Sequence, residues 1–163
     1  MTPKLPISVL VVVHAAGGDV LLLERAGRPG LWQSVTGSLD HPEEPLVEAA
    51  RRELREETGI GAEAADLRRW NLTYTFEIFA QWRHRFLPGT THNTEHVFSI
   101  ELPGRVPVAL APDEHVASLW LPWREAVAKC FSWTNRDAIR IVSQFAGPIS
   151  GPCACAFVNS CAR

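Results

Sequence analysis

The sequence predicts an α/β/α sandwich, in which helices cover both faces of one mixed β-sheet. Short apolar runs bounded by glycine, proline or polar residues recur along the chain, as expected of strands. Two longer segments carry apolar residues at helical spacing and alternate with the strands. Of the 163 residues, 46% are hydrophobic and 21% are charged, which are the proportions of a globular domain with a buried core.

The first half of the chain is expected to form three strands and a helix. Residues 7–14 and 20–25 are apolar runs, and the Gly-Gly-Asp sequence between them is typical of a tight hairpin. A shorter strand is expected over residues 32–36. A helix is expected over about residues 44–58, where apolar side chains recur at helical spacing and Gly59 stands where a C-cap glycine belongs.

The second half is expected to add strands and two further helices. Aromatic and β-branched residues favour strands over residues 72–79, 95–102 and 115–121. Pro122 opens a short helix that ends near residue 130. Ser132 or Thr134 would cap a final helix that ends near residue 145.

We expect one domain over residues 1–146 and a flexible tail over residues 147–163, where small residues dominate. The tail contains Cys153, Cys155 and Cys161. A zinc site is the alternative interpretation. The single residue between Cys153 and Cys155 is fewer than the roughly two to four that usually separate zinc-binding cysteines.

The charge of the chain restricts its partners. A formal net charge of −2 without a basic stripe argues against a nucleic-acid partner. An anionic small-molecule substrate would have to be held by a bound cation or by a few placed arginines and lysines. Residues 1–6 lack the features of a signal peptide, and the apolar run 7–13 is too short to span a bilayer. We therefore expect a cytoplasmic protein with no membrane partner, while its oligomeric state is left open.

Glutamate side chains gather on one side of the expected helix. Glu53, Glu56 and Glu57 are three and four residues apart, so they project together. Glu44 lies about two and a half turns earlier on a neighbouring face. Like charges at this spacing destabilise a helix unless a group such as Mg²⁺ neutralises them, and Mg²⁺ binds carboxylates together with substrate phosphates. The alternative interpretation is a solvated helix face on which nearby arginines pair with the glutamates.

The sequence from Gly37 to Ile60 resembles the signature of the Nudix hydrolases. It carries Gly, Glu and then Arg-Glu-Leu-x-Glu-Glu-x-Gly-Ile. The middle glutamate of the signature falls at Glu43 when counted from the glycine, but at Glu44 when counted back from Arg52. We interpret this as one extra loop residue, with Glu44 taking the role. The resemblance implies a Nudix-type α/β/α sandwich that hydrolyses a phosphoric anhydride.

The resemblance also implies roles for individual residues. The implied metal ligands are all glutamates: Glu53, Glu56, Glu57 and Glu114. The first three form the catalytic set together with Arg52, which orients them, and Glu56 is either a ligand or the base. The implied cofactor is Mg²⁺, with Mn²⁺ as a possible substitute. Gly37 would give the loop a tight turn and offer its carbonyl to the metal, and His115 is either a proton-transfer group or a structural residue.

Segments outside this motif resemble one branch of the family, the bacterial dihydroneopterin triphosphate pyrophosphatases. These segments are residues 32–38, 76–79, 83–86, 93–95, 114–115 and 132–136. The branch implies release of pyrophosphate from the pterin triphosphate in folate biosynthesis, leaving the monophosphate. Two alternatives stay open: a house-cleaning nucleoside triphosphate pyrophosphatase, and a catalytically silent nucleotide-sensing module on the same fold. The complete set of helix glutamates argues against the silent module.

Substrate contacts are expected from charged and aromatic residues. Lys4 and Arg25 would contact phosphate oxygens, although each alone is more typical of a solvated surface charge. Phe76 and Phe79 would line a slot for a flat ring, and the alternative places both in the core. Glu77 would accept hydrogen bonds from ring nitrogens. The resemblance alone adds three further contacts: Thr36, Ile78 and Ser132.

Overall fold

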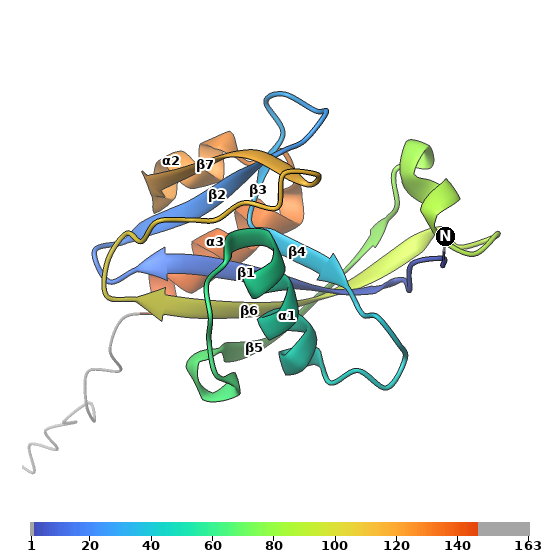
Figure 1. Ribbon diagram of the computed structural model, residues 1–163, viewed down its shortest axis with the longest axis horizontal. Helices are drawn as coiled ribbons and strands as arrows, with labels where there is room; N and C mark the ends of the chain where they lie inside the picture. Colours follow the sequence, from blue (N-terminus) through green and yellow to red (C-terminus); the bar gives the residue numbers. More distant parts are fainter. Residues whose placement is uncertain (1, 147–163) are drawn as a thin grey trace, which may run out of the picture.

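A mixed sheet of seven strands forms the centre of the protein, with one helix on one face and two on the other (Figure 1). The computed structural model describes residues 2–146, and these counts refer to them. The strands are β1 (Ile7–Ala15), β2 (Asp19–Arg25), β3 (Trp32–Gln33), β4 (Val35–Ser38), β5 (Arg68–Glu77), β6 (His92–Leu102) and β7 (His115–Pro122). The helical elements are α1 (Leu46–Thr58), α2 (Trp123–Lys129), α3 (Trp133–Phe145) and the 3-10 turns η1 (Ala64–Asp66) and η2 (Ala80–Arg85). The predicted α/β/α sandwich is confirmed.

Strand β1 is buried on both of its faces. Val9, Val11 and Val13 pack into the core on the α1 side, whereas Leu10 and Val12 pack into the core on the α3 side. β1 runs parallel to β6 and antiparallel to β4. A strand covered on both faces requires a continuous apolar run, which explains the sequence of β1.

The single strand predicted over residues 32–36 is wrong, because the structure forms two strands there. β3 pairs with β2, whereas β4 pairs with β1. β1 and β2 pair with each other only near their hairpin, where His14 lies opposite Val20. Farther from the hairpin, β1 pairs with β4 and β2 pairs with β3. The chain changes partner at Ser34, which is fully buried and whose N–H donates to Asn135 Oδ1 at 2.7 Å.

Helix α1 begins at Leu46, two residues later than predicted. Pro45 is extended (φ −60°, ψ 133°), and Glu44 is disfavoured in a helical conformation because it precedes a proline. The predicted C-cap is confirmed, since Gly59 has a φ of 73° and its N–H donates to the Arg55 carbonyl. The apolar side of α1 packs against β1, which places its glutamates over β4.

The later strands are present, but their limits differ from the prediction. β5 begins at Arg68 and ends at Glu77, so residues 78–79 lie beyond it, and β6 begins three residues earlier than predicted, at His92. The two strands extend together: Arg68 lies opposite Ser99, and Glu77 lies opposite His92. Pairing between distant segments therefore decides these limits where the local pattern is weak.

Helix α3 begins directly after Ser132, which occupies the N-cap position. The Ser132 hydroxyl makes no cap hydrogen bond to the helix backbone and lies 2.9 Å from the Thr134 hydroxyl. Ser132 is therefore the N-cap residue, as predicted, but its hydroxyl pairs with that of Thr134 instead of with the helix backbone.

The remaining predictions concern membranes and the tail. Within residues 2–146, no helix combines the length and the apolar character needed to cross a bilayer. The tail at 147–163, with Cys153, Cys155 and Cys161, lies outside the described residues. Cys130 is a buried free thiol.

Candidate active site

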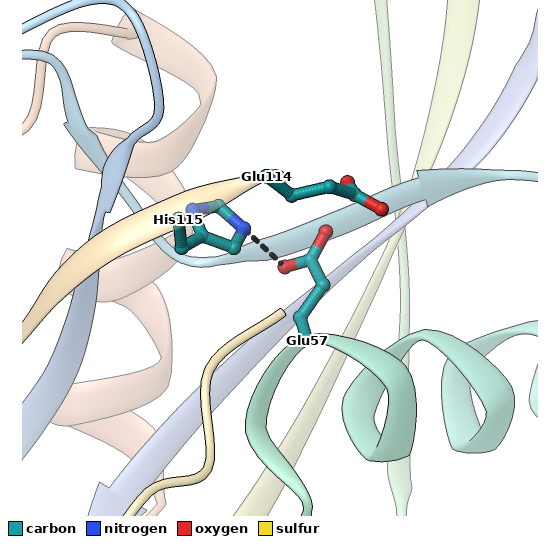
Figure 2. Close-up of side chains that lie close together, drawn as sticks. All are labelled: Glu57, Glu114 and His115. Atoms are coloured by element: carbon teal, nitrogen blue, oxygen red, sulfur yellow. Dashed lines mark ion pairs between the residues drawn. The ribbon is translucent and has the colours of Figure 1, made fainter. Parts of the chain in front are cut away.

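Acidic side chains from two distant parts of the chain meet where β7 begins (Figure 2). Glu57 comes from the last turn of α1, whereas His115 is the first residue of β7 and Glu114 directly precedes it. One ligand atom from each of these three residues lies within 4.8 Å of the other two. The group is therefore compact enough to hold one cation.

Glu57 is a buried carboxylate whose hydrogen bonding is incomplete. Its Oε2 lies 3.1 Å from His115 Nε2 (Figure 2), but the two atoms are not aligned for a hydrogen bond, and neither has a partner within residues 2–146. Burial raises the pKa of Glu57, and His115 opposes that shift. A buried carboxylate is costly unless another group satisfies it, and a divalent cation would do so. The residues present therefore fit a metal.

Glu53 approaches the sheet at Gly37. A Cβ on Gly37 would lie 1.8 Å from the Glu53 Cδ, so the carboxylate occupies the space of the missing side chain. Gly37 lies within β4 and does not have a positive φ. Its predicted role in a tight turn is therefore wrong, and glycine is required because the carboxylate packs against its backbone. Burial raises the pKa of Glu53 to about 7.

Arg52 connects the loop before α1 to the helix glutamates. Its guanidinium donates to both carboxylate oxygens of Glu44, at 2.9 and 3.1 Å, and to Glu53 at 2.8 Å. It also donates to the Ser38 carbonyl at 3.0 Å. Glu44 is thus the glutamate that contacts Arg52, whereas the Glu43 side chain is 85% exposed. This multiple hydrogen bonding fixes the position of the Glu53 carboxylate.

The four glutamates predicted as metal ligands differ in their surroundings. Glu53 and Glu57 are buried, whereas Glu56 and Glu114 are exposed. Glu57 and Glu114 belong to the compact group, and Glu53 and Glu56 lie outside it. The side chain of Glu56 is 54% exposed, and its Oε2 lies 3.3 Å from the Arg52 guanidinium. Among the predicted ligands, Glu56 is therefore the one directed most toward solvent on α1.

A cavity of about 660 Å³ opens beside the acidic group. Its wall carries Lys4 and Arg25, as predicted for phosphate contacts, and includes Thr36 and Glu114. Burial lowers the pKa of Lys4, and the negative charges of Glu53 and Glu114 oppose the shift. Basic groups next to clustered carboxylates suit a phosphate chain that is bound partly through a cation.

The same cavity has an aromatic region. The residues predicted to contact the rest of the substrate all border it: Phe76, Glu77, Ile78, Phe79 and Ser132. Phe79 is 52% exposed, so the interpretation that buries both phenylalanines in the core is wrong. Glu77, which was expected to accept hydrogen bonds from ring nitrogens, has a side chain that is 68% exposed and forms an ion pair with Arg83 through one carboxylate oxygen.

No role was predicted from the sequence for two residues of this cavity, Trp82 and Glu95, although Glu95 belongs to the segment 93–95 that carries part of the resemblance. Trp82 lies in η2, and the Arg25 guanidinium lies 5.4 Å from the centroid of its ring, which is cation–π distance. Glu95 is buried on β6 and also borders the cavity. Residues around Trp82 show no strand or helix periodicity, and Glu95 is one polar residue at the start of an expected strand. Neither feature is a local signal of a binding site.

Comparison with known families decides the family. The NUDIX domain model matches residues 4–141. The chain belongs to the Nudix family. This Nudix hydrolase is 43% identical over 139 residues to the dihydroneopterin triphosphate diphosphatase of Escherichia coli K12, covering 83% of this chain and 91% of that protein. It is 36% identical over 137 residues to the Haemophilus influenzae protein of the same name, covering 82% and 84%.

The fold of the Nudix hydrolase is also similar to a solved structure. The E. coli dihydroneopterin triphosphate pyrophosphohydrolase superposes with a TM-score of 0.80 at 41% identity, covering 89% of this chain and 97% of that chain. The predicted family and Nudix-type fold are therefore confirmed. Nudix hydrolases generally use a divalent metal, and the group formed by Glu57, Glu114 and His115 agrees with that use.

Proposed function

We propose that this Nudix hydrolase cleaves dihydroneopterin triphosphate to the monophosphate and pyrophosphate, a reaction of folate biosynthesis. The observation that carries the proposal is a single cavity that combines basic groups with an aromatic slot and meets the acidic group at Glu114. A flat ring joined to a triphosphate has the same two parts. The relatives at 43% and 36% identity carry this substrate in their names.

The expected cofactor is Mg²⁺, with Mn²⁺ as a substitute. Glu53, Glu57 and Glu114 would hold the cation, and Glu56 would be a further ligand or the base. When bound, the cation polarises a phosphoryl group and lowers the pKa of a bound water. The donor set fits because carboxylate oxygens are the ligands that Mg²⁺ prefers, and because the Oε2 of Glu57 lacks a hydrogen-bond partner.

Other residues bind and orient the substrate. Arg52 holds Glu53 in place through a 2.8 Å hydrogen bond. Lys4 and Arg25 would neutralise phosphate oxygens, and Gln33 accepts a hydrogen bond from Arg25 at 3.2 Å, which restricts that guanidinium. The remaining expected contacts are Thr36, Phe76, Glu77, Ile78, Phe79 and Ser132. Holding the ring and the phosphates at once would position the reacting phosphorus, which is the main contribution a protein makes to phosphoryl transfer.

Pyrophosphate release from dihydroneopterin triphosphate tests this proposal. The assay would include a panel of nucleoside triphosphates and would be run with Mg²⁺ and with a chelator. We expect Mg²⁺-dependent cleavage, with kcat/KM for the pterin at least about tenfold above that for each nucleotide. Faster cleavage of a nucleotide would move the function to cleaning of the nucleotide pool, and no cleavage at all would favour a silent sensing module.

A further inference from the structure

Glu95 is a buried carboxylate to which the proposed hydrolysis gives no role. It lies on β6 opposite Tyr74 of β5 and Ser8 of β1, and it is 4% exposed. It nevertheless borders the cavity. Asn93, two residues earlier on the same face of β6, lies opposite Phe76. Glu95 therefore belongs to the part of the cavity that contains the aromatic slot.

The carboxylate of Glu95 keeps a free acceptor. Its Oε1 has no hydrogen-bond partner within the described part of the chain. Neighbouring donors are used elsewhere: the Tyr74 hydroxyl donates to an aspartate of α3 at 2.7 Å, and the Asn93 amide donates to Ser8 Oγ at 2.7 Å. Burial raises the pKa of Glu95 to about 7, and a hydrogen bond with Thr134 partly opposes this shift. No positively charged side chain contributes to the shift.

A free acceptor of this kind indicates a ligand that donates. Buried polar groups are almost always hydrogen-bonded, because an unpaired one has lost its water and gained nothing. Phosphate oxygens cannot fill the role, since they are acceptors and carry negative charge. They suit the Lys4 and Arg25 side chains instead. Because Glu95 borders the cavity, its carboxylate suits the part of a substrate that carries N–H groups rather than the phosphates.

In the proposed function, that part is the pterin ring, so the inference rests on the proposed function. A pterin presents an exocyclic amino group beside a ring N–H, and guanine presents the same pair. We infer that Glu95 determines ring specificity by accepting hydrogen bonds from this amino group and the adjoining ring N–H. The site then takes 2-amino-4-oxo rings and rejects adenine, which presents an acceptor nitrogen beside its amino group. Glu77, from which contacts to ring nitrogens were expected, is the more exposed of the two carboxylates and forms an ion pair with Arg83.

Two nucleotides that differ by this amino group test the inference without any variant. Guanosine triphosphate carries the 2-amino group and inosine triphosphate lacks it, while both have the same phosphates and the same ring N–H. Each would be measured as a competitor of dihydroneopterin triphosphate cleavage by the wild-type protein. We expect guanosine triphosphate to bind at least about tenfold more tightly. Equal inhibition constants would overturn the inference.

A substitution then assigns the effect to one side chain. Glu95→Gln keeps the size of the residue but places an amide against the ring donors, so the preference for guanosine over inosine triphosphate should fall to about threefold or less. The matched control is Glu101→Gln on the same strand, where the side chain is 55% exposed, and it should keep the wild-type preference. A folded Glu95→Gln protein with the wild-type preference would overturn the assignment.

Failure of the inference is distinguishable from failure of the proposed function. If the wild-type protein does not cleave dihydroneopterin triphosphate, the proposed function fails, and the two nucleotides are then compared by direct binding. A guanosine preference that depends on Glu95 would still support the ring-recognition role. If the pterin is cleaved with strong preference and Glu95→Gln leaves the nucleotide preference unchanged, the inference alone is wrong.

Discussion

Replacing Gly37 by alanine tests whether the position of the Glu53 carboxylate controls turnover. The added Cβ would lie 1.8 Å from the Glu53 Cδ and 1.9 Å from its Oε1. Ordinary van der Waals contact begins at 3.4 Å, so the carboxylate must move by about 1.6 Å, the difference between 3.4 and 1.8 Å. It cannot move freely, because Arg52 holds it at 2.8 Å and the residue is 8% exposed.

The size of the effect follows from that displacement. Misplacing a catalytic group by about 1 Å costs roughly 10²-fold in rate, so we expect kcat for Gly37→Ala to fall about 100-fold. Alanine can adopt the strand conformation of Gly37, so the protein should fold. Overpacking should cost about 1–3 kcal/mol, which corresponds to a loss of roughly 2–12 °C in Tm.

A coupled assay of pyrophosphate release gives kcat, and thermal melting followed by circular dichroism gives Tm. The matched control is Gly61→Ala, because a Cβ at Gly61 would meet no atom within 4 Å. That variant should match the wild type in both measurements. A Gly37→Ala protein with unchanged Tm and with kcat within about threefold of wild type would refute the reasoning.

Three further substitutions test the remaining parts of the account. Glu57→Gln should lower kcat by at least about 10²-fold in a folded protein, because a charged group at the reaction centre is lost, and near-normal turnover would overturn its assignment. Arg52→Met should lower kcat by roughly 10–100-fold, because Glu53 loses the donor that holds it. Arg55 is exposed on the same helix, so Arg55→Met should leave kcat unchanged, and equal losses in the two variants would contradict the role of Arg52. Because burial raises the pKa of Glu95 from 4.5 to about 7, the folded protein binds this proton more tightly than the unfolded chain. The stability of the metal-free wild type relative to Glu95→Gln should therefore fall as pH rises through that window, by roughly 3 kcal/mol at most. Urea unfolding in chelator at about pH 5 and about pH 7.5 measures this difference, and a constant difference would contradict the shift.

The limits of α1 show what local sequence determines. Its apolar spacing selects the buried side, and Gly59 ends it with a positive φ, so both could be predicted. Its start at Leu46 is also a local effect, because Pro45 disfavours a helical conformation at the residue before it. The break at Ser34 could not be predicted, because it depends on a hydrogen bond to Asn135, which lies 101 residues later in the chain.

The same distinction applies to the site. The spacing of Glu53, Glu56 and Glu57 places them on one helix, which the sequence shows directly. Spacing does not show that Glu56 is exposed while the other two are buried, because burial depends on how α1 packs over β4. The free acceptor on Glu95 belongs to a carboxylate that contacts Thr134 of α3, 39 residues later in the chain, and no local pattern contains that contact.

The identity of the phosphorus products tests the central claim most directly. Phosphorus NMR would follow dihydroneopterin triphosphate with purified protein and Mg²⁺, with chelator and with Glu57→Gln as controls. The account predicts pyrophosphate and dihydroneopterin monophosphate from the wild type with Mg²⁺, and unchanged substrate in both controls. Release of orthophosphate to leave the diphosphate, or unchanged substrate in the presence of wild type and Mg²⁺, would contradict it.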